Sequence, residues 1–338
     1  MKKLLLNLLK FSISAAIIGY LVYSAQNDAD FARLASQPKH WGLLAAALGV
    51  ATVATLVTFV RWYLLVRAVE LPFSVRDALR LGALGYLFNF VSLGSVGGDL
   101  FKAVFIAREQ PGRRAEAVAT VVIDRVVGLY SMFLLASFFI LIFGQLQSSV
   151  REIQIICQAT LIGTTIGTVG VVMLFVPGFT QGRLSDYLGN RPRIGPPFRK
   201  LLGAIRLYRS KPAVLAAAVA ASLLSHTGLV LAIFLIAQGL SGGAPDLADH
   251  FLIVPLAMVA SALPLPLNGL GAFEGVVDFL YRNCDSAVTS HQGLIVALGY
   301  RVVTIVIAVF CMGIYLSHRR EVAEVVREAE REEAEAAA

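Results

Sequence analysis

The chain has 338 residues, of which 57% are hydrophobic and only 15% are charged, and its mean hydropathy is +0.74. A soluble domain carries roughly a quarter charged residues, so this composition excludes a soluble protein and predicts an integral membrane protein built of helices. The net charge of +7 has no separate basic domain behind it, which argues against a nucleic-acid partner and favours anionic phospholipid headgroups. The three cysteines are scattered and predict neither a disulfide framework nor a metal site, and no cofactor is expected.

Six segments are predicted to cross the membrane completely. The first, near residues 4–23, follows two lysines and has no clear small-residue cleavage site after it, so we interpret it as a retained span. The other five are apolar runs close to or above the roughly 20 residues that a bilayer requires. These runs are 41–60, 126–143, 153–176, 213–240 and 293–316.

Four further apolar pieces are too short or too interrupted to span the membrane. They form two pairs, 81–91 with 100–107 and 251–267 with 275–281, and each pair is expected to form a re-entrant hairpin. Arginines flank the first hairpin on both sides, whereas the loops around the second carry almost none. By the positive-inside rule, the first hairpin enters from the cytoplasm and the second from outside.

The predicted fold class is therefore an all-α membrane protein with six full spans and two opposed re-entrant hairpins. Its inverted repeats lie around 79–143 and 250–316, within a transmembrane domain covering 1–317. The basic segment 178–212 is interpreted as a cytoplasmic connector and 318–338 as a charged cytoplasmic tail. This topology places both termini in the cytoplasm, and we expect a bacterial-type plasma (inner) membrane.

Two glycine-rich stretches, each ending in a carboxylate, are the most informative motifs. The first is Gly94-Ser95-Val96-Gly97-Gly98-Asp99, and the second is Asn268-Gly269-Leu270-Gly271-Ala272-Phe273-Glu274, with an offset of 175 residues. Glycine permits unusual backbone angles and close approach to an anion, although tight packing by small residues is an alternative. Buried charges persist only where protein or water satisfies them. The pair therefore predicts a transport site, with the glycines as backbone or hinge elements.

Two arginines follow the acids at nearly the same offset. Arg125 lies in Asp124-Arg125-Val126-Val127, and Arg301 lies in Tyr300-Arg301-Val302-Val303. A guanidinium binds phosphate through two parallel hydrogen bonds and stays protonated when buried, which suits a phospholipid headgroup. The alternative is that Asp99–Arg125 and Glu274–Arg301 are ion pairs that lock helices together.

Three more charged residues complete the predicted substrate-binding set. Lys102 follows Asp99 by three residues on the same helical face, which suggests a local ion pair or attraction of a headgroup. Asp124 points about 100° away from Arg125 and needs another partner, either Arg61 or Lys102. Arg61 is interpreted either as an interfacial anchor or as part of the site.

Other functions leave weaker traces in the sequence. Nucleotide-binding, zinc-protease and serine-hydrolase motifs are absent, and we predict no enzymatic activity. Asp28 and Asp30 in an expected external loop keep open a membrane transferase that acts on a lipid-linked substrate. A non-catalytic partner of a separate lipid-modifying enzyme is a further alternative. His226, alone in an apolar span, is interpreted as a packing residue.

Several of these motifs together resemble one known family. They are Arg61-Trp62, Gly97-Gly98-Asp99-x-x-Lys102, Asp124-Arg125-x-x-Gly128 and Pro266-x-x-Gly269-x-Gly271-x-x-Glu274. They resemble the lysylphosphatidylglycerol synthase transmembrane, or flippase-like, family. In bifunctional members this region moves aminoacylated phosphatidylglycerol between leaflets, and a separate soluble C-terminal domain attaches the amino acid.

The resemblance covers roughly residues 4–316 and implies a stand-alone member without the synthase domain, because only about 20 residues follow the last predicted span. The implied function is translocation of a phospholipid or lipid-phosphate, aminoacylated phosphatidylglycerol included. Lys102 stands where many relatives have arginine, so the resemblance implies no two-point phosphate contact at that position.

Overall fold

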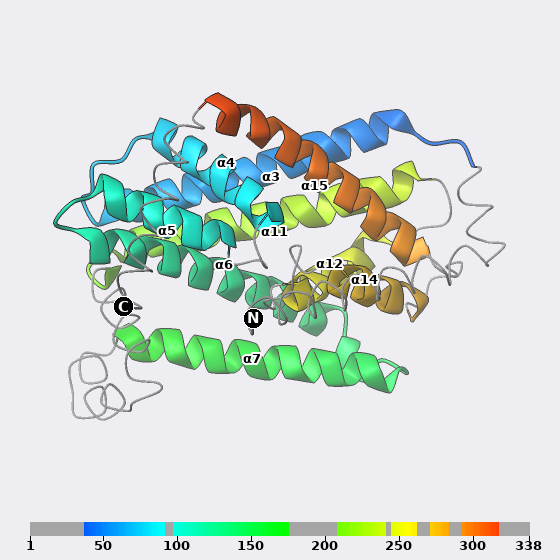
Figure 1. Cartoon of the computed structure of the whole chain (residues 1–338). Helices are drawn as coiled ribbons and strands as arrows, with labels where there is room; N and C mark the ends of the chain where they lie inside the picture. Colours follow the sequence, from blue (N-terminus) through cyan, green and yellow to red (C-terminus); the bar gives the residue numbers. More distant parts are fainter. Residues whose placement is uncertain are drawn as a thin grey trace, which may run out of the picture.

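The computed structural model describes residues 37–91, 97–175, 208–240, 245–261, 271–283 and 292–317. Within these ranges the regular structure is helical, without β-strands (Figure 1). The elements are α3 (Trp41–Ala68), α4 (Val75–Val91), α5 (Gly97–Glu109), α6 (Arg114–Ile142), η1 (Gln145–Gln147), α7 (Arg151–Phe175), α11 (Pro212–Gly239), α12 (Leu247–Ser261), α14 (Ala272–Arg282) and α15 (Gln292–Ser317).

Among the described residues, five helices are long and apolar enough to cross a membrane: α3, α6, α7, α11 and α15. They correspond to the five long apolar runs of the sequence. The sixth predicted span, near 4–23, lies outside the described residues, as do most of the 178–212 connector and the whole 318–338 tail. The protein is therefore an all-helical integral membrane protein.

Two of these helices extend well beyond their predicted apolar runs. The apolar run 41–60 continues in α3 to Ala68, and α6 begins at Arg114 rather than near residue 126. The added turns carry charged side chains that pair with neighbouring helices instead of ending the helix. Hydropathy marks only the part of each helix without charges, so it underestimated both lengths.

The helices α3 and α11 form the most extensive helix–helix contact of the described bundle. They run antiparallel, since the backbone N–H of His40 before α3 donates to the carbonyl oxygen of Gly239 at the end of α11 (2.9 Å). Near mid-length, Ser225 Oγ donates to the Ala54 carbonyl oxygen (2.9 Å). Small residues allow this close approach, as is usual between membrane helices.

Four short helices pack as two pairs, α4 with α5 and α12 with α14. They have 17, 13, 15 and 11 residues, which corresponds to about 16 to 26 Å at 1.5 Å per residue. The hydrocarbon core is about 30 Å thick, so none of them spans it alone. At the α4–α5 contact, a Cβ on Gly98 would lie 2.0 Å from the carbonyl oxygen of Gly85, so only glycine fits there.

Helix contacts follow the same order in two parts of the chain. The series α3, α4, α5, α6 and the series α11, α12, α14, α15 each run as a long helix, two short helices and a long helix (Figure 1). Successive members pack on one another in both series. Between the series, α4 packs on α15, and its counterpart α12 packs on α6. The helix α7 packs beside α6 at the edge of the bundle.

One end of the bundle gathers three connecting segments. The carboxylate of Glu70 after α3 accepts from Lys211 Nζ before α11 (3.2 Å), and Arg113 before α6 donates to the carbonyl oxygens of Val69 and Glu70. Tyr208 Oη donates to the Leu65 carbonyl oxygen (2.8 Å). The His40–Gly239 contact lies at the other end of α3 and α11. We refer to the end that carries Glu70 as the basic end, because arginines and lysines cluster in its loops.

Candidate functional site

The first acid, Asp99, is the third residue of α5 and lies between two cations. Its carboxylate accepts from Arg125 Nη1 of α6, and Lys102 Nζ lies 3.9 Å from the other carboxylate oxygen. The first turn of a helix favours a carboxylate because the helix dipole is positive there. Arg125 and Asp99 keep 36% and 23% of their side-chain surface exposed. This pair is therefore held in place but remains accessible.

The Lys102 side chain links three helices rather than pointing away from the site. Its ammonium lies 5.2 Å from the centre of the Trp62 ring of α3, close enough for a cation–π contact. Its methylene stem packs where a Cβ on Gly85 of α4 would stand. The predicted ion pair with Asp99 is present, and the contacts with Trp62 and Gly85 hold the ammonium group in place.

The second acid, Glu274, lies in the first turn of α14 and is almost completely buried. One carboxylate oxygen accepts from the backbone N–H of Gly271 (2.7 Å). The other accepts from Nε and Nη2 of Arg301 on α15 (3.0 and 2.7 Å). Only 1% of the Glu274 side chain and 11% of the Arg301 side chain are exposed. Gly271 has a φ of +94°, a conformation that disfavours any other residue.

The two pairs have the same construction. Each acid begins a short helix, and its arginine lies 26 or 27 residues later in the long helix that follows. The sequence left open whether these residues form ion pairs or bind phosphate, and in this structure both ion pairs are formed. The pairs differ in accessibility, because the first is partly exposed and the second is closed.

A third ion pair, which is buried, joins α3, α6 and α11. Arg61 Nε donates to Asp124 Oδ1 (2.7 Å), and Arg61 Nη1 donates to Ser222 Oγ (2.7 Å). Of the two partners considered for Asp124, the structure therefore shows Arg61. The side chain of Arg61 is buried, so it is part of the bundle interior and does not act as an exposed interfacial anchor. A Cβ on Gly128 would lie 3.1 Å from Arg61 Nη1, so glycine leaves room for the guanidinium.

His226 lies beside this cluster and packs α11 against α6, as expected for a packing histidine in an apolar span. Its Nε2 lies 3.0 Å from the carbonyl oxygen of Gly128. The other ring nitrogen, Nδ1, is buried and has no hydrogen-bond partner among the described residues. His226 follows Ser222 by four residues on one face of α11, a spacing that could have linked the two residues from sequence.

A cavity of about 150 Å³ lies between α3, α4, α11 and α15. Its lining carries six hydroxyl groups, from Thr55, Thr58, Tyr86, Ser225, Tyr300 and Thr304. Several of these hydroxyls donate to backbone carbonyls of their own or a neighbouring helix. Sequence reasoning missed this cavity because its hydroxyls are spread over four helices and each is ordinary for a membrane helix.

The comparison with protein families now decides the assignment. The family model for the lysylphosphatidylglycerol synthase TM region matches residues 7–313. The chain belongs to this family. The assignment gives it a role connected with membrane lipids. None of the curated proteins compared with the chain matches it.

The matched region of this lysylphosphatidylglycerol synthase TM family member contains every residue of the predicted site. The structure brings Asp99, Lys102 and Arg125 together, Glu274 with Arg301, and Arg61 with Asp124. Gly97, Gly98 and Gly271 lie at the starts of α5 and α14. Gly94, Gly269, Asp28 and Asp30 lie outside the described residues.

Proposed function

We propose that this protein moves a phospholipid or another lipid-phosphate, aminoacylated phosphatidylglycerol included, from one leaflet to the other. The observation that carries the proposal is the matched pair of carboxylate–guanidinium contacts, Asp99–Arg125 and Glu274–Arg301. Charged groups inside membrane proteins are rare and usually mark a substrate pathway. Membership of the lysylphosphatidylglycerol synthase TM family supports a lipid as that substrate.

We also infer that the two helix series are an inverted repeat with two re-entrant hairpins. The antiparallel packing of α3 on α11, the pairing of the short helices, and the reciprocal contacts of α4 with α15 and α12 with α6 support this inference. With a span near 4–23, the chain would cross six times and keep both termini in the cytoplasm of a bacterial-type plasma membrane. Secondary transporters commonly combine such repeats with interrupted helices around the substrate.

The chemistry assigns one task to each member of a pair. The arginine binds the lipid phosphate, and the carboxylate binds the same guanidinium when no phosphate is present or holds a cationic headgroup. Exchanging one anion for the other keeps the arginine paired, and a cationic headgroup would then compensate the displaced carboxylate. In this structure the Asp99–Arg125 pair is the accessible one, and it would meet the lipid first.

Transfer of a fluorescent headgroup between the leaflets of proteoliposomes tests the proposal. Arg125→Lys and Arg301→Lys keep the charge but lose the planar donor fork, and each is expected to slow transfer about tenfold, equivalent to roughly 1.4 kcal/mol. Arg151→Gln, an exposed arginine at the start of α7, is the matched control and should transfer at the normal rate. Unchanged transfer by the double variant Asp99→Asn with Glu274→Gln would show that the charged pairs are not the site.

The same assay addresses the alternative of a non-catalytic membrane partner. If the purified protein moves no lipid and instead co-purifies with a lipid-modifying enzyme, the partner role replaces the transport role. A covalently altered lipid in the vesicles would instead indicate a membrane transferase.

A further inference from the structure

The two charged sites of the bundle differ by one residue. The first site consists of Asp99, Lys102 and Arg125, and the second consists of Glu274 and Arg301. Lys102 follows the first acid by three residues, whereas the same position after the second acid is Val277, which is completely buried and uncharged. Among the described residues, the first site therefore combines two cations with one carboxylate, and the second combines one of each.

The Lys102 ammonium lies against an aromatic ring that is itself anchored. Trp62 is completely buried, its Nε1 donates to Thr120 Oγ1 (3.2 Å), and its ring packs edge-on against Phe73 with 5.1 Å between the ring centres. The ammonium lies 5.2 Å from the centre of the Trp62 ring, and tryptophan offers the most favourable aromatic face for a cation. Only 13% of the Lys102 side chain is exposed, so its charge is directed into the bundle.

A carboxylate beside an aromatic face is a combination that binds the ammonium group of a ligand. In the first site this combination is already occupied, because the Lys102 ammonium lies between Asp99 and Trp62. An ammonium group on a lipid headgroup would have to displace Lys102, and it would add a third cation to a single carboxylate. The first site is therefore unfavourable for a cationic group.

A lipid phosphate requires no such displacement. When a phosphate replaces the carboxylate at the Arg125 guanidinium, Asp99 is still paired with Lys102. Two neutral pairs result, which avoids the large cost of a buried charge without a partner. At the second site Val277 offers no replacement partner to Glu274, so this way of balancing charge belongs to the first site alone.

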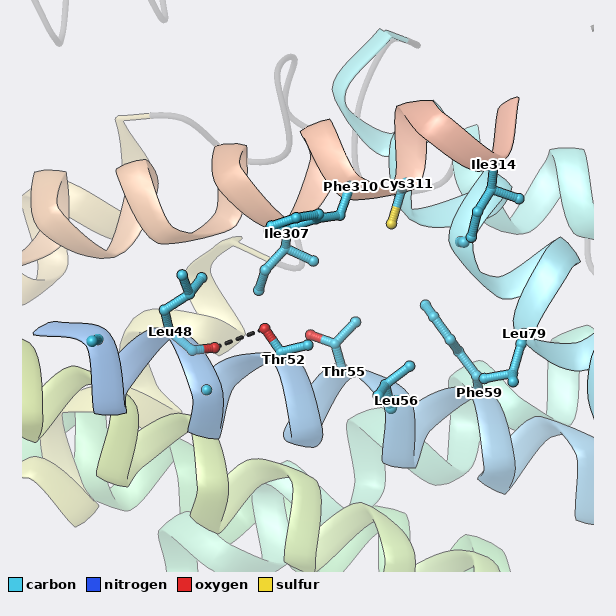
Figure 2. A pocket seen from close by; sticks show the side chains of 13 residues that line it. Leu48, Thr52, Thr55, Leu56, Phe59, Leu79, Ile307, Phe310, Cys311 and Ile314 are labelled. Carbon is cyan, nitrogen blue, oxygen red and sulfur yellow. Dashed lines mark hydrogen bonds between the residues drawn. The ribbon is translucent and has the colours of Figure 1, made fainter. Parts of the chain in front are cut away.

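The apolar groove between α3, α4 and α15 cannot make the same distinction. It has a volume of about 580 Å³, and aliphatic, aromatic, hydroxyl and thiol side chains line it without any charged residue (Figure 2). Its Thr52 hydroxyl donates to the Leu48 carbonyl oxygen of the same helix (2.7 Å). Such a surface does not separate an anionic from a zwitterionic headgroup, so the selection falls to the charged site.

We propose that the first site selects lipids whose phosphate headgroup carries no cation, with Lys102 as the specificity-determining residue and Trp62 as the residue that positions it. The proposal rests on the lipid-transport function and narrows its substrate class at the more accessible of the two sites. A phosphodiester that ends in uncharged hydroxyl groups, as in phosphatidylglycerol, fits this site. A zwitterionic headgroup, as in phosphatidylethanolamine, does not.

Binding of two lipids that differ in headgroup charge tests the proposal. The full chain in detergent is titrated with dioctanoyl-phosphatidylglycerol or with dioctanoyl-phosphatidylethanolamine, and isothermal titration calorimetry gives a Kd for each. The unmodified protein should bind the phosphatidylglycerol about tenfold more tightly, the usual effect of one hydrogen bond to a charged group. This comparison needs no substitution and so does not depend on the folding of a variant.

Lys102→Met removes the charge and keeps an unbranched side chain of similar size. The ratio of the two Kd values should fall to about one, because the space between Asp99 and Trp62 then admits the ammonium group of phosphatidylethanolamine. Arg108→Gln is the matched control, since it removes the same formal charge from the exposed end of the same helix and should keep the tenfold preference. Thermal unfolding midpoints confirm that both variants fold.

Trp62→Phe tests the positioning role. It keeps an aromatic ring but weakens the cation–π contact and loses the hydrogen bond to Thr120. The variant should lower the ratio of the two Kd values when Lys102 is present and leave it unchanged when Lys102 is already methionine, because Trp62 acts through Lys102. A purely structural role would weaken the binding of both lipids equally and leave the ratio as it was.

Equal Kd values of the two lipids for the unmodified protein, or an unchanged ratio in the folded Lys102→Met variant, would overturn the proposal. So would an equal change of the ratio in Arg108→Gln, which would assign the preference to overall charge. Because the readout is binding, it is separate from transport. Selective binding without headgroup transfer would contradict the transport function and leave a selective lipid site, whereas transfer without selective binding would contradict only the selectivity.

Discussion

Individual charged residues in this protein differ in how fully they are removed from solvent. The Arg61–Asp124 pair is buried, with 8% and 7% of the side chains exposed, and Ser222 completes its hydrogen bonding. The Asp99–Arg125 pair retains more exposure. The cost of losing one partner should follow this difference, because a buried charge without its partner is far more costly than an accessible one.

Removing either acid measures that difference. Asp124→Ala should destabilise the protein by about 3–5 kcal/mol, since it leaves the buried Arg61 guanidinium without a counter-charge. Asp99→Ala should cost about 0–1 kcal/mol, because that pair keeps 36% and 23% of its side-chain surface exposed. Thermal unfolding in detergent compares the two. A smaller loss of stability for Asp124→Ala than for Asp99→Ala would contradict the burial seen here.

The sequence predicted part of this arrangement and missed the rest for physical reasons. Asp99 and Glu274 could be matched with Arg125 and Arg301 because each acid and its arginine recur at a nearly constant offset. The partner of Asp124 stayed open because Arg61 lies 63 residues away and nothing in the local pattern distinguishes it from Lys102. The interpretation of His226 as a packing histidine agrees with the structure, but its partner Gly128 could not be named because the contact depends on packing between helices.

The short helix α5 depends on glycine for its place beside α4. The backbone N–H of Gly98 donates to the Asn89 side-chain oxygen (2.8 Å), and its Cα faces the Gly85 carbonyl at a distance that excludes a methyl group. The first turn of α5, which carries Asp99, is therefore positioned by backbone contact. The sequence indicated glycines near an acid, but it could not show which glycine was required by contact and which by turn geometry.

Alanine substitutions distinguish that requirement from ordinary helix propensity. Gly98→Ala should cost about 1–3 kcal/mol, because the added methyl group forces α4 and α5 apart. Gly275→Ala in α14 is the matched control, as its Cβ would meet no atom within 4 Å, and it should be neutral or stabilising by about 0.5–1 kcal/mol. Unfolding midpoints and, for Gly98→Ala, headgroup transfer report the result.

The helix α7 is joined to α6 by pairs of hydroxyls. Ser137 Oγ and Thr164 Oγ1 are 2.6 Å apart, and Tyr130 Oη and Thr168 Oγ1 are 2.9 Å apart. Replacing Ser137 by Ala together with Thr164 by Val should cost only about 0.6 kcal/mol, the average for such contacts between membrane helices. A shift of the unfolding midpoint as large as that expected for Asp124→Ala would show that α7 contributes more than a peripheral contact.

The whole molecule combines two similar series of helices with one basic end. Contacts among Glu70, Arg113 and Lys211 gather three loops there, and by the positive-inside rule we propose that this end faces the cytoplasm. Loop charges alone lead to this orientation, and it stays a prediction. The sequence could not show that the loops meet, because their contacts join residues more than 40 positions apart.

Single cysteines test this orientation in a variant from which the three native cysteines have been removed. Glu70→Cys should react with a membrane-impermeant maleimide only when the reagent is supplied to the cytoplasmic side. His40→Cys, at the opposite end of α3, should react only from the other side. Labelling of both positions from one side would exclude a complete crossing by α3.

The Arg61 guanidinium makes the two helix series chemically different when their residues are aligned at Arg125 and Arg301. Gly128 lies three residues after Arg125, and Thr304 lies three residues after Arg301. Thr304 borders the hydroxyl-lined cavity, whereas the Arg61 guanidinium occupies the space beside Gly128. The two series of helices, which share the order long, short, short, long, therefore differ in chemistry at these positions: hydroxyl groups line a cavity at Thr304, and a guanidinium lies against Gly128. The shared order of helices does not make the two parts of the bundle chemically equivalent.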